Sequence, residues 1–292
     1  MRETQQNPNR PRPVREFAPA KINLFLHVGA KRPDGHHDLQ SLVVFARAGD
    51  ELVLEVADEV SLELSGPFAA DLASAPDNLV LKAARALAAE TAFHGGARLK
   101  LTKNLPVASG IGGGSADAAA ALRGLNALWG LGLQAEDLRR IAERIGSDVP
   151  VCVEPRPAWM EGRGEKVRAL DAVAALPMVL VNPRAAVSTG KIFAALDRRS
   201  GTGLSLPPPL MDATELIAYL RSKTNDLEPP ARLAAPVIGE VLKALAARPG
   251  VLIARMSGSG ATCFALFEDD TVARQAAASL RAQFPQWWTV SA

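Results

Sequence analysis

One stretch of the chain, residues 105–117, has residue types and spacing that suit anion binding, with four glycines between an expected strand and an expected helix. Glycine lets the backbone adopt positive φ angles and lets an anion approach the amides closely. A helix start adds free N–H groups and the positive end of the helix dipole. Ser115 has the residue type of an N-cap, so we expect the helix to begin there. The stretch predicts a phosphate cradle, although a structural turn could use the same residues.

The spacing within this stretch separates classes of phosphate-binding proteins. A P-loop ends in Gly-Lys-Ser/Thr, whereas Gly114 is followed by Ser115 and Ala116. A dinucleotide fingerprint counted from Gly110 needs glycine or alanine where Ser115 stands. The chain contains neither the His-Arg-Asp nor the Asp-Phe-Gly signature of protein kinases. These three classes are therefore disfavoured.

Asp148 is a candidate for acid–base chemistry, because it leads an expected helix-to-strand connection among small and apolar residues. The alternative is an aspartate that only caps a helix or stabilises a turn. Lys21 stands at the start of an expected strand, and by itself it suits a solvated lysine equally well.

Composition excludes several function classes. A chain of 292 residues is long enough for one large or two ordinary domains. A net charge of +2 and 5% aromatic residues give no reason to expect a nucleic acid as partner, and no apolar run is long enough to span a membrane. Cys152 and Cys263 lie in apolar runs, so we expect buried free thiols and a cytoplasmic protein.

The elements that position the candidates fall into two expected domains after a disordered tail at 1–14, which does not read as a secretory signal. Residues 15–165 are expected to form the catalytic domain, with successive and therefore antiparallel strands and helices. The expected strands are 22–28, 39–47, 50–56, 60–64 and 98–103, and the expected helices are 78–93 (capped by Asp77), 118–129 and 136–145.

Residues 166–292 are expected to form a second domain. Its expected strands are 177–181, 251–256, 261–267 and 287–291, and its expected helices are 188–197, 214–221, about 233–247 (interrupted or begun by Pro236) and 271–284. The β-α-β-β-α-β order indicates a ferredoxin-like arrangement. We therefore predict an α+β protein of two domains.

The motifs resemble those of a known enzyme superfamily. Pro106-x-x-x-Gly110-Ile111-Gly112-Gly113-Gly114-Ser115 resembles the phosphate loop of the kinases that act on galactose, homoserine, mevalonate and phosphomevalonate. Residues 20–26 and 32–42 resemble the N-terminal block of the 4-diphosphocytidyl-2-C-methyl-D-erythritol kinase family within that superfamily. Further blocks agree in order, at 77–79, 146–150, 161–165, 225–228 and 258–261.

The resemblance implies ATP-dependent phosphorylation of the 2-hydroxyl of a methylerythritol unit carried on cytidine diphosphate, in the non-mevalonate isoprenoid route. It implies a ribosomal-S5-domain-2-like first domain, a ferredoxin-like second domain on the substrate side, and an active site between them. It assigns Lys21 and Asp148 as the catalytic pair. Asp148 would accept the hydroxyl proton, and Lys21 would keep Asp148 ionised and stabilise developing negative charge.

The resemblance also assigns binding residues. For ATP they are Pro106, Val107, Ala108, Ser109, Gly110, Ile111, Gly112, Gly113, Gly114, Ser115, Ala116, Lys103 and Asn78. Mg²⁺ is expected with the nucleotide, and Ser115 offers a hydroxyl ligand. For the cytidine-bearing substrate they are Asn23, His36, His37, Thr189 and Phe193. His36 stands where the family pattern has a tyrosine that stacks on cytosine, and Phe193 alone would equally suit core packing.

Three alternatives differ in class. A sibling kinase would act on another small alcohol, which the Gly35-His36-His37 block argues against. An RNA-binding protein is suggested by the basic tail and by the ribosomal relatives of the first domain, but it has no use for a complete glycine loop and Asp148. A nicotinamide-dependent oxidoreductase is disfavoured by the failed dinucleotide fingerprint.

Overall fold

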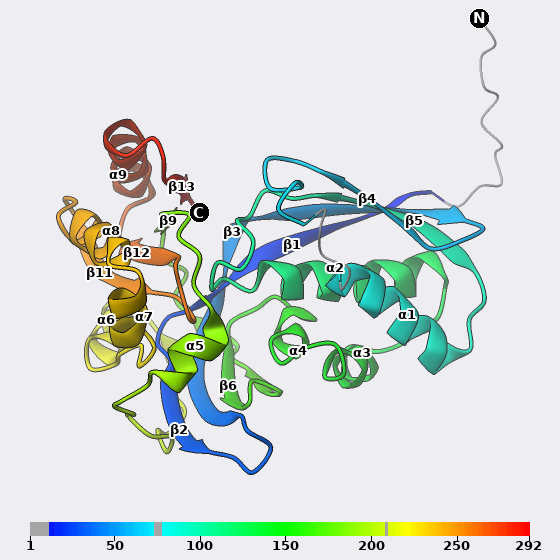
Figure 1. Cartoon of the computed structure of the whole chain (residues 1–292), viewed down its shortest axis with the longest axis horizontal. Helices are drawn as coiled ribbons and strands as arrows, with labels where there is room; N and C mark the ends of the chain where they lie inside the picture. Colours follow the sequence, from blue (N-terminus) through cyan, green and yellow to red (C-terminus); the bar gives the residue numbers. More distant parts are fainter. Residues whose placement is uncertain (1–11, 73–77, 208–209) are drawn as a thin grey trace, which may run out of the picture.

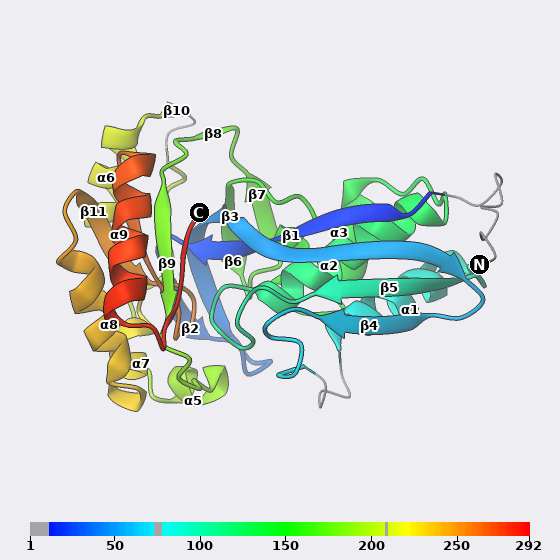
Figure 2. The same cartoon turned by 90° about the horizontal axis from the view of Figure 1, so that it is seen from above.

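The computed structural model describes residues 12–72, 78–207 and 210–292. Figure 1 shows two bodies side by side along the long axis, each built on one antiparallel or largely antiparallel sheet, and Figure 2 shows the same bodies from above. The first body contains β1 to β7 and α1 to α4, and the second contains the elements from β8 onward. This arrangement confirms the predicted α+β fold with two parts.

The first sheet is organised around one long strand, β3 (His37–Ala57). The sheet order is β4-β5-β3-β6-β7, and β1 and β2 also pair with β3. The bounds are β1 Val14–Asn23, β2 His27–Lys31, β4 Ser61–Ser65, β5 Gly96–Thr102, β6 Ala158–Gly162 and β7 Lys166–Ala169.

Three expectations for this sheet are wrong. The strand predicted at 22–28 is instead the end of β1 and the start of β2, separated by residues 24–26. The separate strands predicted at 39–47 and 50–56 are one strand, because Gly49 continues the ladder instead of turning the chain. A Cβ on Gly49 would lie 2.5 Å from the carbonyl oxygen of Ala18, so the glycine serves the close approach of β1. The pairing is also not wholly antiparallel, since β4 and β5 run parallel.

Helices α1 (Leu79–Thr91) and α2 (Gly113–Leu128) pack against each other, and α2 also covers β1 and β3. Helix α2 begins at Gly113, five residues before the helix predicted at 118–129. Its N-cap is Gly112 at φ 62°, three residues before Ser115, so the expected cap role of Ser115 is wrong. Asn78 caps α1 by accepting a hydrogen bond from the amide of Val80, while the predicted cap Asp77 lies outside the described residues.

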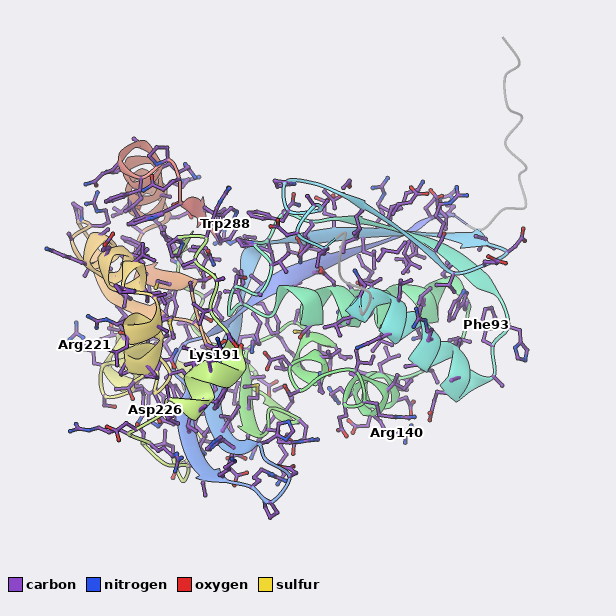
Figure 3. All side chains as sticks on the ribbon, viewed as in Figure 1. Phe93, Arg140, Lys191, Arg221, Asp226 and Trp288 are labelled. Carbon is purple, nitrogen blue, oxygen red and sulfur yellow. The ribbon has the colours of Figure 1, made fainter. Side chains whose placement is uncertain are left out.

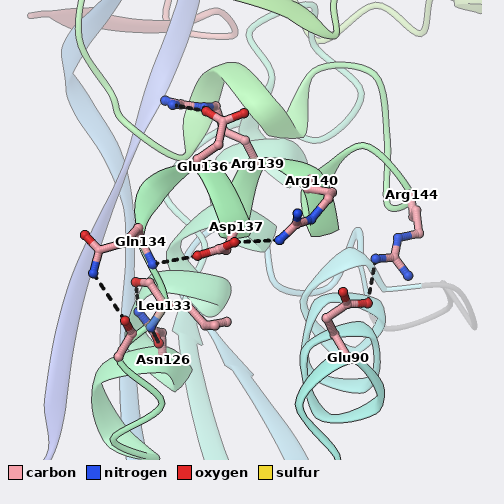
Figure 4. A network of polar contacts seen from close by, with 10 residues as sticks. Glu90, Asn126, Leu133, Gln134, Glu136, Asp137, Arg139, Arg140 and Arg144 are labelled. Carbon is pink, nitrogen blue, oxygen red and sulfur yellow. Dashed lines mark hydrogen bonds and ion pairs between the residues drawn. The ribbon is translucent and has the colours of Figure 1, made fainter.

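Two shorter helices complete the first body, α3 (Ala135–Ala142) and α4 (Val149–Cys152). Figure 4 shows the polar contacts around α3, where Asp137 accepts from the amide of Gln134 and pairs with Arg140 at 2.5 Å. Arg144 pairs with Glu90 at 2.6 Å and ties the end of this region to α1. These exposed pairs orient α3 more than they stabilise it.

The second body has the ferredoxin-like sheet order β11-β12-β9-β13, all antiparallel. Its strands are β8 Ala172–Val173, β9 Met178–Asn182, β10 Leu210–Met211, β11 Val251–Met256, β12 Cys263–Phe267 and β13 Trp288–Ser291. Its helices are α5 Thr189–Ala194, α6 Ala213–Arg221, α7 Glu228–Ala234, α8 Val237–Ala246 and α9 Asp270–Gln283. The helix predicted at about 233–247 is interrupted at Pro236, as expected: residues 233 and 234 end α7, and Pro236 is the N-cap of α8.

The two bodies share a core. Phe25 and Trp159 of the first part lie in one buried cluster with Leu180 and Phe264 of the second. Figure 3 shows side chains filling this junction, with Phe93 and Arg140 at the outer end of the first body and Lys191 near the junction.

Two expected boundaries, the one between the domains and the end of the N-terminal tail, can be compared with the observed strands. The division expected after residue 165 falls inside the β6–β7 hairpin, whose second strand still belongs to the first sheet. Residues 1–11 of the expected tail lie outside the described residues, and Val14 already begins β1.

The two cysteines, Cys152 and Cys263, are both buried free thiols, as predicted. Among the described residues no helix is long and apolar enough to cross a membrane.

Candidate active site

A cavity of about 420 Å³ lies where the two bodies meet. Its lining comes from β1, the segment between β5 and α2, the residues before α4, helix α5 and the turn between β11 and β12. Elements far apart in sequence therefore build one site at the junction.

The glycine-rich segment forms one wall of this cavity. Of the residues expected to bind ATP, the structure places these at the cavity: Asn78, Lys103, Pro106, Val107, Ala108, Ser109, Gly110, Gly112, Gly113, Gly114 and Ser115. Ile111 and Ala116 face the hydrophobic core instead. The N-terminus of the 16-residue helix α2 points at this wall, which is the arrangement that attracts phosphate.

The glycine loop is pressed against a second glycine turn, Gly258–Gly260, from the other body. A Cβ on Gly110 would lie 2.6 Å from the carbonyl oxygen of Ser257, and a Cβ on Gly258 would lie 2.6 Å from that of Gly110. Ser257 also donates its hydroxyl to the Gly110 carbonyl at 3.1 Å. Backbone contact between the bodies thus fixes the loop, and Gly110 serves packing as well as phosphate access.

Lys21 and Asp148 meet at the cavity. Lys21 Nζ lies 2.8 Å from Asp148 Oδ2, and the lysine side chain is 3% exposed against 36% for the aspartate. The lysine backbone amide donates to the carbonyl of Ile111 at 2.9 Å, so β1 is tied to the glycine loop. Asp148 stands at the N-cap of α4, yet its carboxylate makes no cap hydrogen bond there. Asp148 therefore bonds to Lys21 instead of capping, and its other oxygen is available to a ligand.

Lys103 lines the cavity, but its ammonium is occupied by two buried carboxylates. It donates to Asp117 Oδ2 at 2.8 Å and to Asp50 Oδ2. Asp50 Oδ1 also accepts from the amides of Asn104 (2.5 Å) and Leu105 (2.8 Å), which lead into the glycine loop. Through these two amide hydrogen bonds, the cluster fixes the position of the residues that lead into the glycine loop.

The charge balance of this cluster shifts its proton affinities. Burial, followed by the neighbouring Asp50 charge, raises the pKa of Asp117 to about 7 against the opposing effect of Lys103. Burial alone would lower the pKa of Lys103, but the negative charges of Asp117 and Asp50 outweigh burial and raise that pKa. The lysine therefore stays charged and holds both carboxylates.

Asn23 places an acceptor at the cavity. Its side-chain NH₂ donates to Ser41 Oγ at 2.8 Å, and Ser41 in turn donates to the carbonyl of Phe25. Its Oδ1 is buried and has no hydrogen-bond partner among the described residues. A buried acceptor without a partner is costly unless a ligand supplies the donor.

A second cavity of about 470 Å³ adjoins the first and contains His36, His37, Thr189 and Phe193 in its lining. The rings of His37 and Phe193 are stacked, with centroids 5.6 Å apart and an angle of 19°. His36 is 57% exposed at the rim. Thr189 Oγ1 lies 2.8 Å from Ser259 Oγ, which joins α5 to the second glycine turn.

Several residues of the site were not among the predicted ones. Asp50 had no sequence signal, since it lies in an expected strand far from every motif. Asp117 and Arg163 lie inside the motif blocks at 105–117 and 161–165, but the motifs predict no function for either residue. Their contacts with the site depend on residues that only the fold brings close to them.

The cavity, its glycine wall and the Lys21–Asp148 pair can now be compared with known proteins. A family model described as "GHMP kinases N terminal domain" matches residues 78–155, and a second one, described as "GHMP kinases C terminal", matches residues 209–286. The fold also matches a homoserine kinase from Cytophaga hutchinsonii, with TM-score 0.67 at 17% identity over 100% of this chain and 96% of that one. The fold and site therefore define a small-molecule kinase of the GHMP class.

Relatives of higher identity narrow the class. A 4-diphosphocytidyl-2-C-methyl-D-erythritol kinase from Parvibaculum lavamentivorans is 53% identical over 281 residues, covering 94% of this chain and 96% of the relative. One from Paramagnetospirillum magneticum is 50% identical over 94% and 96% of the two chains. A crystal structure of a 4-(cytidine 5'-diphospho)-2C-methyl-D-erythritol kinase has TM-score 0.77 at 34% identity, covering 95% of this chain and 98% of that one. The chain belongs to the 4-diphosphocytidyl-2-C-methyl-D-erythritol kinase family.

Proposed function

We propose that this protein transfers the γ-phosphoryl group of ATP to the 2-hydroxyl of 4-diphosphocytidyl-2-C-methyl-D-erythritol, a step of the non-mevalonate route to isoprenoid precursors. The observation that carries the proposal is the Lys21–Asp148 pair, 2.8 Å apart, in the same cavity as the glycine loop. The names of the relatives supply the substrate.

The arrangement accounts for each part of the transfer. The amides of the glycine loop and the N-terminus of α2 hold the triphosphate of ATP. Asp148 takes the proton of the substrate hydroxyl, whose oxygen forms a bond to the γ-phosphorus while the bond to ADP breaks. Lys21 holds Asp148 in position through the 2.8 Å ion pair and compensates negative charge on the moving group. Asn23 Oδ1 offers an acceptor to a second hydroxyl of the substrate.

The second cavity suits the cytidine end. His37 and Phe193 provide flat rings and a ring nitrogen, and Thr189 provides a hydroxyl. Because this cavity adjoins the first, a substrate with its base here can extend its sugar-like end to Asp148. We also propose a cytoplasmic location, which two buried free thiols support.

Mg²⁺ is expected with the nucleotide, where it would neutralise phosphate charge. The hydroxyl of Ser115 lies at the cavity, and the described residues hold no cluster of three or more side chains able to bind a metal. The residues present therefore fit an ion held chiefly by phosphate oxygens and water, with Ser115 as a protein ligand.

A substrate panel tests the proposal. ADP release is measured with the cytidylated substrate, mevalonate and homoserine under identical conditions. The expected result is turnover of the cytidylated substrate with kcat/KM at least about 10³-fold above the other two, because only it fills both cavities. Equal or higher turnover of homoserine or mevalonate contradicts the assigned substrate.

A further inference from the structure

Arg163 lies in the turn between β6 and β7, and this turn packs directly on the catalytic carboxylate. A Cβ on Gly164, the next residue, would lie 2.9 Å from the carbonyl oxygen of Ser147 and 3.6 Å from Asp148 Oδ1. The turn is therefore held beside Asp148, and a long side chain at position 163 reaches the space around it.

The two cavities share a wall, and Arg163 is part of it. The described residues that line both cavities are Leu39, Ser147, Arg163, Thr189 and Phe193. Of these five, Arg163 alone carries a charge. A ligand that extends from one cavity into the other therefore lies along a wall to which Arg163 contributes the charge.

The other cations of the first cavity are already engaged. Lys21 is hydrogen-bonded to Asp148, and Lys103 to both Asp50 and Asp117. The ion pair that Arg163 forms among the described residues is a 4.0 Å contact with Glu165, too long for a hydrogen bond. That carboxylate accepts the backbone amide of Arg163 at 2.5 Å instead. The guanidinium, 37% exposed, thus keeps its donors free for a ligand.

We propose that Arg163 binds the diphosphate of the second substrate. The inference rests on the proposed function: with cytidine in the second cavity and the reacting hydroxyl at Asp148, the diphosphate between them crosses the shared wall. Guanidinium presents two parallel N–H groups that match phosphate oxygens, and it remains charged at every working pH. Arg163 is a substrate-binding residue in this assignment, and it anchors the linker so that the hydroxyl reaches Asp148.

Calorimetric titration with cytidine and with cytidine diphosphate tests the assignment on the intact protein. The variants are Arg163→Gln and Arg163→Lys, and the matched control is Arg168→Gln, an exposed arginine on β7 away from both cavities. We expect Arg163→Gln to reduce the preference for cytidine diphosphate over cytidine by about tenfold, with cytidine affinity unchanged. Arg163→Lys should lose less, and Arg168→Gln nothing.

Steady-state kinetics supply the second measurement. Arg163→Gln should raise KM for the cytidylated substrate about tenfold and leave KM for ATP within twofold. An unchanged preference for cytidine diphosphate in a variant of an active enzyme overturns the Arg163 assignment alone. A wild-type protein that binds ATP but does not phosphorylate the cytidylated substrate overturns the proposed function, and this inference with it.

Discussion

Lys21 Nζ donates to Asp148 Oδ2 at 2.8 Å across 127 positions of sequence, joining β1 to the start of α4. The lysine is buried and the aspartate half-exposed, so the pair is open to a ligand from the carboxylate side. The buried cation attracts the accessible carboxylate and fixes its position. In the proposed reaction this carboxylate accepts the proton of an alcohol that is delivered from the cavity.

Replacing Asp148 with asparagine tests this role. We expect kcat to fall by about 10²–10⁴-fold, because the amide cannot accept the hydroxyl proton, while the dissociation constant for ATP changes less than threefold. Kinetics and calorimetric titration with ATP measure the two effects. Asp171→Asn, at a position 95% exposed, is the control and should match the wild type. Near-normal turnover of Asp148→Asn would remove the residue from catalysis.

A substitution at Gly112 tests the link between the glycine loop and Lys21, the lysine of the proposed catalytic pair. Gly112 has φ 62°, and an added Cβ would lie 3.3 Å from both Cβ and Cε of Lys21. Gly112→Ala should therefore strain the loop and displace Lys21, lowering kcat/KM by tenfold or more. Gly130→Ala is the matched control, because Gly130 has φ 65° but a Cβ there meets nothing within 4 Å. The control should lose about 1 kcal/mol of stability and no activity; equal activity of the two variants would refute the link.

The pH dependence of stability reports on the buried cluster below the loop. Asp117 has a pKa of about 7 in the folded protein, above the value of about 3.9 expected in the unfolded chain. Between these two values the folded state holds a proton that the unfolded state has lost, so stability falls as pH rises through this window.

Asp117→Asn removes this titration. The melting temperature of the variant relative to wild type should rise steadily from pH 4.5 to pH 7.5, as measured by thermal denaturation in a low-salt buffer series. The asparagine keeps an acceptor for Lys103, which still pairs with Asp50. A difference that does not change with pH would show that Asp117 does not carry the proton.

His36 offers a gain-of-affinity test. A larger ring at this rim position should stack more extensively on a pyrimidine, so His36→Tyr is expected to lower KM for the cytidylated substrate about two- to fivefold. His36→Ala should raise it. His94→Tyr, an exposed histidine outside the lining of both cavities, is the control. If all three variants match the wild type, the base does not stack on position 36.

The sequence predicted most elements because their patterns are local, such as the alternation over 98–103 and the alanine-rich helix after the glycines. It misplaced the start of α2, because a glycine at positive φ can cap a helix where the residue type of Ser115 seemed the better choice. It divided β3 at Gly49, where glycine serves contact with β1 and not a turn. Asp50 stayed hidden because its partners are backbone amides and Lys103, far along the chain.

The single long strand β3 has a consequence for how this protein can vary. His37 at its start lines the second cavity, and Asp50 farther along holds the residues that enter the glycine loop. Side chains on a strand alternate between faces, so inserting or deleting one residue between these two positions would turn one of them away from its partner. The number of residues in this one strand therefore sets the spacing between the second cavity and the glycine loop of the first.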